Sequence, residues 1–170
     1  MYYRTKTYLA GDWTGDFDAI TTLKKWNNDN YLTLSFVDVH DFISARDSSL
    51  NCTIKNTLRE RMNMSKTFVL IVGNETKNLR AGSCQYCNSL NSYSHYCSRG
   101  HTIDYRSYVE YECDLAIKAG IKIVVLYNST VVDKSKCPDA VRNQETHIPM
   151  LYYSNGVKRW DYSTIMQCLS

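Results

Sequence analysis

Apolar and polar positions alternate in blocks along the chain, and the apolar blocks predict buried strands. The strongest block, residues 66–72, becomes continuously apolar after Thr67 and stops at Gly73. A run of this kind is typical of a strand that is buried on both faces, as in a parallel sheet. Five strands are predicted in all, at residues 6–10, 32–39, 66–72, 121–127 and 148–153.

Between these strands the apolar residues recur at the period of a helix. Ile54, Leu58 and Met62 repeat every four residues, which places them on one face of a helix. Asp16 is a suitable N-cap for the first such segment, and Gly120 ends the third, where a C-terminal glycine is favoured. Four helices are predicted, at about residues 16–27, 53–64, 105–119 and 160–169.

The alternation of strands and helices predicts an α/β fold. Because parallel strands are joined by right-handed crossovers through helices, we expect a three-layer, flavodoxin-like architecture, with a five-stranded parallel sheet and helices on both of its faces. No internal repeat divides the chain. We therefore predict a single domain over residues 1–170.

Residues 78–104 interrupt this pattern. The segment is rich in Ser, Tyr, Cys and Asn and has no clear period, so it is predicted to be an insertion in the domain. It contains residue types that ligate zinc, namely Cys84, Cys87, His95 and Cys97, with His101 following. A structural zinc would hold together a loop that has little to bury. The alternative is a set of reduced cysteines in a variable loop.

Composition and charge indicate which kinds of partner and which cellular compartment to expect. The formal net charge is +3, from 20 basic and 17 acidic residues, which gives no electrostatic reason to expect nucleic acid or an anionic membrane as a partner. No segment approaches the roughly 20 apolar residues that cross a bilayer, and residues 1–6 lack the pattern of a signal peptide. A cytoplasmic protein is expected, whose cysteines are thiols or metal ligands.

Candidate binding residues follow the predicted strands, because the ligand site of a parallel α/β sheet lies outside the carboxyl ends of its strands. These residues are Gly11, Asp12, Trp13 and Asp16 after the first strand, Asp38, His40 and Asp41 after the second, and Gly73 and Asn74 after the third. Turns favour Gly, Asp and Asn for conformational reasons as well. Ordinary turn chemistry is therefore the alternative for each of them.

Glu112 is the candidate for acid chemistry. On the third predicted helix it lies at the margin of the apolar face made by Val109, Cys113 and Ala116, with Tyr108 on the same side. Partial burial there would raise the proton affinity of the carboxylate. The alternative is a solvated helix carboxylate with no chemical role.

Three segments carry a resemblance to a known family: residues 7–12, 64–76 and 108–116. They read Thr-Tyr-Leu-Ala-Gly-Asp, then a helix end at Ser65 followed by an apolar strand, Gly73 and Thr76, then Tyr-Val-Glu-Tyr-Glu-Cys-Asp-Leu-Ala. Over roughly residues 5–128 this order resembles the bacterial TIR-like family, which includes the TIR proteins of Thoeris anti-phage systems. The resemblance implies a signalling or defence domain.

The resemblance also implies an activity. In catalytic TIR domains a glutamate on the helix before the fourth strand is essential for cleaving the nicotinamide–ribose bond of NAD. Glu112 matches this position, four residues after Tyr108, where the family usually has tryptophan. NAD would then be the substrate, hydrolysed or cyclised, and Glu112 would stabilise the positive charge that develops on the ribose.

This mechanism requires Glu112 to face a cleft lined by the turns that leave the first two strands. The residues expected to bind the nucleotide in that cleft are Gly11, Asp12, Trp13, Asp16, Asp38, His40, Gly73 and Tyr108.

Two other functions fit the same residues. Tyr8-Leu9-Ala10-Gly11 followed by an acidic helix is also similar to nucleoside deoxyribosyltransferases, which use a glutamate on the equivalent helix and act on nucleosides. TIR-like domains also serve as interaction modules without activity. The expected partners are accordingly a nucleotide substrate, further copies of the chain, or other TIR-like and effector proteins.

Overall fold

A parallel sheet forms the centre of the molecule in the computed structural model, which describes residues 4, 6–29, 36–37 and 50–170. Its four longer strands are β1 (Lys6–Ala10), β3 (Ser65–Val72), β6 (Lys122–Tyr127) and β7 (Thr146–Pro149). Two residues of β2 (Phe36–Val37) pair in parallel with β1. The order across the sheet is β2-β1-β3-β6-β7, and the predicted α/β class is confirmed.

The two central strands are buried almost along their whole length, as their sequences predict. In β3 only Lys66 is exposed, and in β6 only Lys122 is exposed. Both lysines lie near the amino ends of their strands, so that the apolar remainder of each strand can be covered on both faces.

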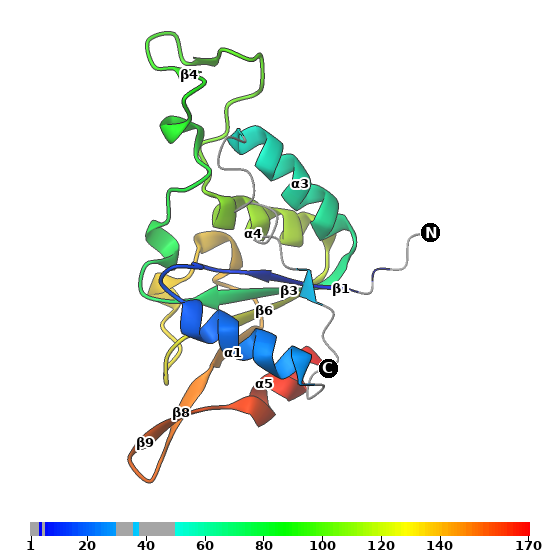
Figure 1. Ribbon diagram of the computed structural model, residues 1–170, viewed down its shortest axis with the longest axis vertical. Helices are drawn as coiled ribbons and strands as arrows, with labels where there is room; N and C mark the ends of the chain where they lie inside the picture. The colour runs from blue at the N-terminus through cyan, green and yellow to red at the C-terminus, as the bar shows by residue number, and fades with distance from the viewer. Residues whose placement is uncertain (1–3, 5, 30–35, 38–49) are drawn as a thin grey trace.

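Helices cover both faces of this sheet (Figure 1). One face carries α3 (Asn51–Asn63) and α4 (Tyr108–Ala119), and the other carries α1 (Phe17–Asn28) and α5 (Tyr162–Leu169). The four predicted helices are therefore present, and each begins and ends within three residues of the positions expected.

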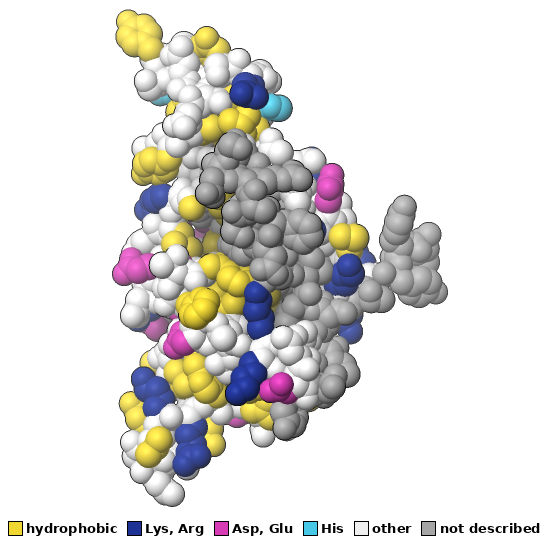
Figure 2. All heavy atoms as spheres, in the orientation of Figure 1, with side chains coloured by type: hydrophobic (Ala, Val, Ile, Leu, Met, Phe, Trp, Pro, Cys, Tyr) yellow, Lys and Arg dark blue, Asp and Glu magenta, His cyan; other side chains and the backbone are white. Residues whose placement is uncertain are grey.

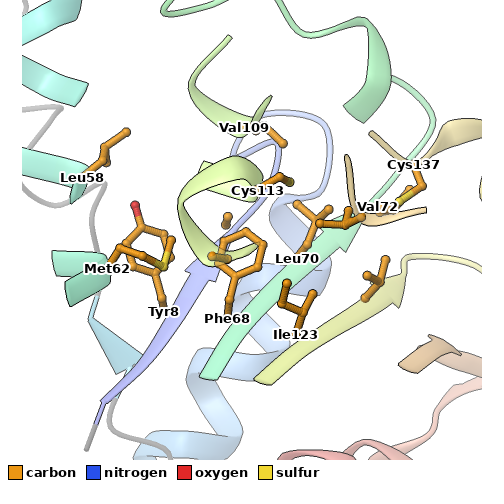
Figure 3. Close-up of a cluster of buried hydrophobic side chains, with 14 of the residues drawn as sticks. Tyr8, Leu58, Met62, Phe68, Leu70, Val72, Val109, Cys113, Ile123 and Cys137 are labelled. Atoms are coloured by element: carbon orange, nitrogen blue, oxygen red, sulfur yellow. The ribbon is translucent and has the colours of Figure 1, made fainter. Parts of the chain in front are cut away.

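Two separate hydrophobic cores follow from the alternation of side chains along the strands. On β1, Tyr8 belongs to the core under α3 and α4, whereas Leu9 belongs to the core under α1 and α5. Figure 3 shows the first core, in which the rings of Tyr8 and Phe68 lie beside Met62 of α3. Tyr8 therefore lies on the face of the sheet that α3 and α4 cover.

Sequence signals define both ends of α4. The Ser107 side chain accepts a hydrogen bond from the Glu110 backbone N–H, and the Glu110 side chain accepts one from the Ser107 N–H. This reciprocal capping box satisfies two amide groups that the first turn of a helix leaves without partners. Gly120 ends the helix in a left-handed conformation, with φ of 60°, which glycine adopts without steric cost.

The predicted fifth strand, residues 148–153, is divided between two sheets. Its first part belongs to β7, and after Met150 the chain enters β8 (Leu151–Ser154), which pairs antiparallel with β9 (Val157–Trp160). The turn between them is Asn155-Gly156, with φ of 51° and 75°. Asn-Gly is a strong hairpin signal, so this hairpin could have been predicted from the sequence.

The β8–β9 hairpin projects from the body of the molecule, and basic and hydrophobic side chains gather on it (Figure 2). The predicted insertion projects at the opposite end (Figure 1). It follows the 3-10 turn η1 (Thr76–Asn78) and holds a second 3-10 turn, η2 (Cys84–Tyr86), and a two-stranded ribbon of β4 (Leu90–Asn91) and β5 (Tyr96–Cys97).

Two further 3-10 turns, η3 (Lys134–Lys136) and η4 (Asp139–Val141), connect β6 to β7. The α4–η4 contact places η4 beside the helix that carries Glu112. None of the helices within the described ranges combines the length and the apolar character that a membrane span needs.

Candidate functional site

Glu112 is buried and hydrogen-bonded to Tyr8. Only 2% of Glu112 is exposed, and the Tyr8 hydroxyl, itself inaccessible, donates to Glu112 Oε1 over 2.6 Å. The carboxylate comes from α4 and the phenol from the middle of β1. The alternative of a solvated helix carboxylate is therefore wrong, because Glu112 turns inward beside the buried Cys113.

Burial controls the ionisation of this pair. Removal from water penalises the charged form and raises the pKa of Glu112 to about 8, although the hydrogen bond from Tyr8 acts in the opposite direction. The pKa of Tyr8 is raised well above its usual value, first by burial and then by the charge of Glu112. At neutral pH the structure therefore favours a protonated Glu112 and a neutral Tyr8.

The surroundings of the pair are mainly apolar, although the charge of the buried Arg61 is near enough to act on Tyr8 and lowers its pKa. The Tyr8 and Phe68 rings are 5.8 Å apart, and Leu58 and Met62 of α3 close the same cluster (Figure 3). An ionised carboxylate in such surroundings is costly unless hydrogen bonds or a cation compensate it. The described pockets are lined by other residues, and Glu112 lines none of them.

Tyr108 occupies a different environment from Glu112, one turn earlier on α4. Its hydroxyl donates to Asn51 Oδ1 over 3.0 Å, and its backbone N–H donates to the Ala81 carbonyl over 2.7 Å. The ring lies against Gly82, where an added Cβ would come within 2.5 Å of Tyr108 Cδ1. Burial raises the pKa of Tyr108 to about 12. Tyr108 thus ties the insertion to the start of α3.

A second group of predicted residues meets at the carboxyl edge of the sheet. Asp16, only 3% exposed, accepts a hydrogen bond at Oδ1 from Asn128 Nδ2 over 2.9 Å. The same amide donates to Asp18 Oδ1 over 2.9 Å. A Cβ on Gly73 would lie 2.0 Å from Asp16 Oδ1, so the close approach of the carboxylate requires glycine at this position.

Asp16 therefore does more than begin a helix. It occupies the N-cap position of α1, as predicted, but its side chain makes no capping hydrogen bond. Burial raises its pKa in spite of the hydrogen bond from Asn128, and the nearby Asp12 and Asp18 act in the same direction as burial.

Gly11, Asp12 and Trp13 shape the turn between β1 and α1. The Asp12 carbonyl accepts from the Asp16 N–H over 2.8 Å, and Asp12 Oδ1 accepts from the Thr14 N–H over 3.0 Å. Gly11 approaches Ile71 of β3, and the Trp13 ring lies under Lys24 Nζ at 4.3 Å. These contacts agree with the turn chemistry that the sequence offered as the alternative.

The predicted residues thus divide between two places. Glu112 meets Tyr8 inside the core below α4, whereas Asp16 and Gly73 meet Asn128 at the edge of the sheet. Glu112, Tyr8, Asp16 and Gly73 line none of the described pockets, so no described pocket provides the cleft that the mechanism requires beside Glu112. Asp38, His40 and Asp41 lie outside the described residues.

The residues predicted to bind zinc do not form a metal-binding cluster. Within the described ranges, which include the whole insertion, no group of three or more His, Cys, Asp or Glu side chains is arranged to hold a metal ion. Cys84, Cys87 and Cys97 are each partly buried free thiols. The zinc site therefore stays a prediction, and metal analysis of the purified protein is its test.

Comparison with protein families finds a match in the first part of the chain. Residues 7–82 match the family described as Thoeris protein ThsB, TIR-like domain. Over these residues the chain is similar to Thoeris-type TIR-like domains. The match confirms the resemblance inferred from the sequence over β1, α1, α3 and β3, and it ends before Glu112. No curated protein matches the chain.

Two residues of these arrangements escaped the sequence analysis. Asn128 follows directly on the apolar run 121–127, so the rule that ligand sites lie at the carboxyl ends of strands would have included it. Tyr8 is a tyrosine inside a short apolar strand. A buried tyrosine usually needs a hydrogen-bond partner for its hydroxyl. The sequence pattern does not predict that Glu112 is this partner, because the two residues are 104 positions apart.

Proposed function

We propose that this TIR-like domain acts in signalling or defence by cleaving the nicotinamide–ribose bond of NAD, with Glu112 as its catalytic carboxylate. The observation that carries the proposal is the buried Glu112–Tyr8 hydrogen bond of 2.6 Å. A carboxyl group with a pKa near 8 in an apolar site is a frequent feature of catalytic centres.

The chemistry of the reaction suits this carboxyl group. When the bond between ribose C1′ and the nicotinamide nitrogen breaks, its electron pair leaves with nicotinamide and the ribose becomes an oxocarbenium ion. A water molecule, or a nucleophilic atom of the same nucleotide, then bonds to C1′ and loses a proton. A negative Glu112 would stabilise the cationic ribose.

Tyr8 supports this role through its hydrogen bond. A phenol that donates to Glu112 Oε1 holds the carboxyl group in one orientation and stabilises its ionised form. The positive charge of the bound nicotinamide ring would favour ionisation further. The kcat/KM for cleavage that depends on ionised Glu112 should rise with pH and level off above about 8, the pKa of the carboxyl group before NAD binds.

The direct test compares Glu112→Gln with the wild type. NAD and its products are measured by chromatography in extracts of expressing cells, with and without phage infection. Glu112→Gln should lose about 10²- to 10³-fold in rate, whereas Glu60→Gln, an exposed carboxylate on α3, should match the wild type. Equal NAD cleavage by the wild type and Glu112→Gln would overturn the proposal.

The same extracts separate the other two functions. A deoxyribosyltransferase would move deoxyribose between added bases and leave NAD intact, since it shares the sugar-cation chemistry but acts on nucleosides. An interaction module would leave both substrates unchanged and would associate with itself or with effector proteins. Thoeris-type identity over residues 7–82 favours NAD over nucleosides.

We further propose a flavodoxin-like fold for the domain. With the two described residues of β2 counted as a strand, the sheet order β2-β1-β3-β6-β7 is the flavodoxin-like order 2-1-3-4-5. Such a domain would work in the cytoplasm, where NAD is available to it.

A further inference from the structure

A pocket of about 650 Å³ lies between α3 and residues 101–106, on the surface side of α4. Thr53, Lys55 and Arg59 of α3 line one wall, and Asp104 and Arg106 line the other. The Tyr111 ring also lines the pocket, with Lys55 Nζ and the Arg106 guanidinium 5.3 Å and 5.0 Å from its centre. Glu112 is not among the residues that line this pocket.

An ion-pair network fixes the shape of the pocket. Asp104 pairs with Lys55 Nζ at 3.2 Å and with Arg106 at 2.8 Å, and Arg106 also bonds to Asp114. Lys55 is only 5% exposed and donates to the Arg106 carbonyl over 2.7 Å. Because the charged groups hold one another in place, little ordering is left for a ligand to impose.

The charge of the lining is positive. Three cationic side chains, Lys55, Arg59 and Arg106, face a single carboxylate, Asp104. Asp104 and Asp114 already compensate Lys55 and Arg106. Arg59 donates to the neutral Asn56 side chain, and within the described residues it forms no ion pair with a carboxylate.

The helix geometry adds to this charge. Cys52 and Thr53, in the first turn of α3, line the pocket, and that turn contains no acidic residue. The first backbone N–H groups of a helix attract anions. Arg59 lies two turns further along the same helix, so its guanidinium and the start of α3 lie along the same wall of the pocket.

We propose that this pocket binds an organic phosphate of nucleotide size, at a site separate from Glu112. The positive lining selects the phosphate, since guanidinium groups and helix starts bind phosphate oxygens well. The volume is that of pockets which hold organic ligands rather than a lone ion. The proposal does not depend on NAD cleavage by Glu112.

Binding of ADP, pyrophosphate and adenosine to the full chain, measured by titration calorimetry at low and high salt, tests the site. ADP should bind, more weakly at high salt, and adenosine should not bind. Pyrophosphate should bind at least about tenfold more weakly than ADP, because it lacks the contacts of the organic part. Absence of ADP binding, or equal affinities for ADP and pyrophosphate, would overturn the assignment.

Variants locate the site. Arg59→Gln should weaken ADP binding about 10- to 100-fold through the loss of a charge-assisted hydrogen bond. Lys118→Gln removes the same charge from an exposed position on α4 that does not line the pocket, and it should bind as the wild type does. Arg59 is exposed, so unchanged circular dichroism is expected for both variants.

A third variant separates this site from the proposed catalytic carboxylate. Glu112→Gln should retain ADP binding while it loses NAD cleavage. Loss of ADP binding in Glu112→Gln, or an equal loss in Arg59→Gln and Lys118→Gln, would contradict a separate site at α3. Failure of NAD cleavage alone would leave the binding result unaffected.

Discussion

Two carboxyl groups close to each other in sequence, Glu112 and Asp104, ionise in opposite ways. Burial raises the pKa of Glu112 to about 8. Asp104 is partly buried, which by itself would raise its pKa, but hydrogen bonds from Arg106 and the charge of Lys55 lower the pKa to about 2. The polar partner of Glu112 is a neutral phenol, whereas Asp104 has two cations.

The pKa of each carboxyl group depends both on its burial and on the charge of its nearest hydrogen-bond partner. A neutral donor such as Tyr8 satisfies a hydrogen bond without compensating the charge, so Glu112 keeps its proton. Cationic partners compensate the charge, so Asp104 loses its proton and holds the wall of a pocket. The first arrangement suits a reacting group, and the second suits a rigid scaffold.

The largest expected effect is the dependence of stability on pH. Folded Glu112 has a pKa of about 8, above the unfolded value of about 4.3, so the folded state binds the extra proton between these values. Its stabilising contribution is complete below the unfolded pKa and is lost as pH rises to about 8. Urea unfolding should show a loss on the order of 3 kcal/mol between pH 5 and pH 8.

Glu112→Gln is the control for this dependence. Because glutamine does not titrate, the variant should lose most of the slope between pH 5 and pH 8, while Asp16 and other groups contribute equally to both proteins. Parallel pH profiles for the variant and the wild type would mean that Glu112 is ionised in the folded protein at neutral pH.

Asp104→Asn should cost about 2 kcal/mol of unfolding free energy. The change removes the carboxylate from the buried Lys55 and from Arg106, and an uncompensated buried cation is strongly unfavourable, although partial exposure reduces the effect. Asp139→Asn is the matched control, since Asp139 pairs with Lys77 and Arg142 at the exposed surface. Urea unfolding of both variants should show a clearly smaller loss for Asp139→Asn.

Gly73→Ala should cost about 1.5 kcal/mol by overpacking, because the new Cβ would lie 2.0 Å from Asp16 Oδ1. In an Asp16→Ala background the same change should cost less, since the carboxylate that clashes is gone. A double-mutant cycle in urea measures this coupling. Additive losses would show that the Asp16 carboxylate does not lie over Gly73.

The smallest expected effect is that of Tyr8→Phe, with a loss of about 1 kcal/mol. The variant removes the hydroxyl that donates to Glu112, and that hydrogen bond lowers the pKa of Glu112. The midpoint of the stability change with pH should therefore move upward. Tyr153→Phe, at an exposed position of the β8–β9 hairpin, should change neither quantity.

Local sequence patterns were enough to predict the apolar strands, the helices that cover them and the TIR-like resemblance. The runs that became β3 and β6 could be recognised because a strand buried on both faces needs apolar residues throughout. The end of α4 was predictable from Gly120, since a left-handed helix end favours glycine. The position of Glu112 on α4 was likewise a matter of local periodicity.

The contacts between polar groups, in contrast, depend on how the elements pack in three dimensions. Tyr8 and Glu112 are separated by 104 positions, and the distance between Asp16 and Asn128 along the chain is 112 positions. The local sequence pattern predicts on which face of a helix or strand a residue lies. It does not predict how two packed elements are shifted relative to each other along their axes. A hydrogen bond needs its donor and acceptor atoms within about 3 Å of each other. This relative shift therefore decides whether a buried carboxyl group contacts a phenol, an amide or a cation.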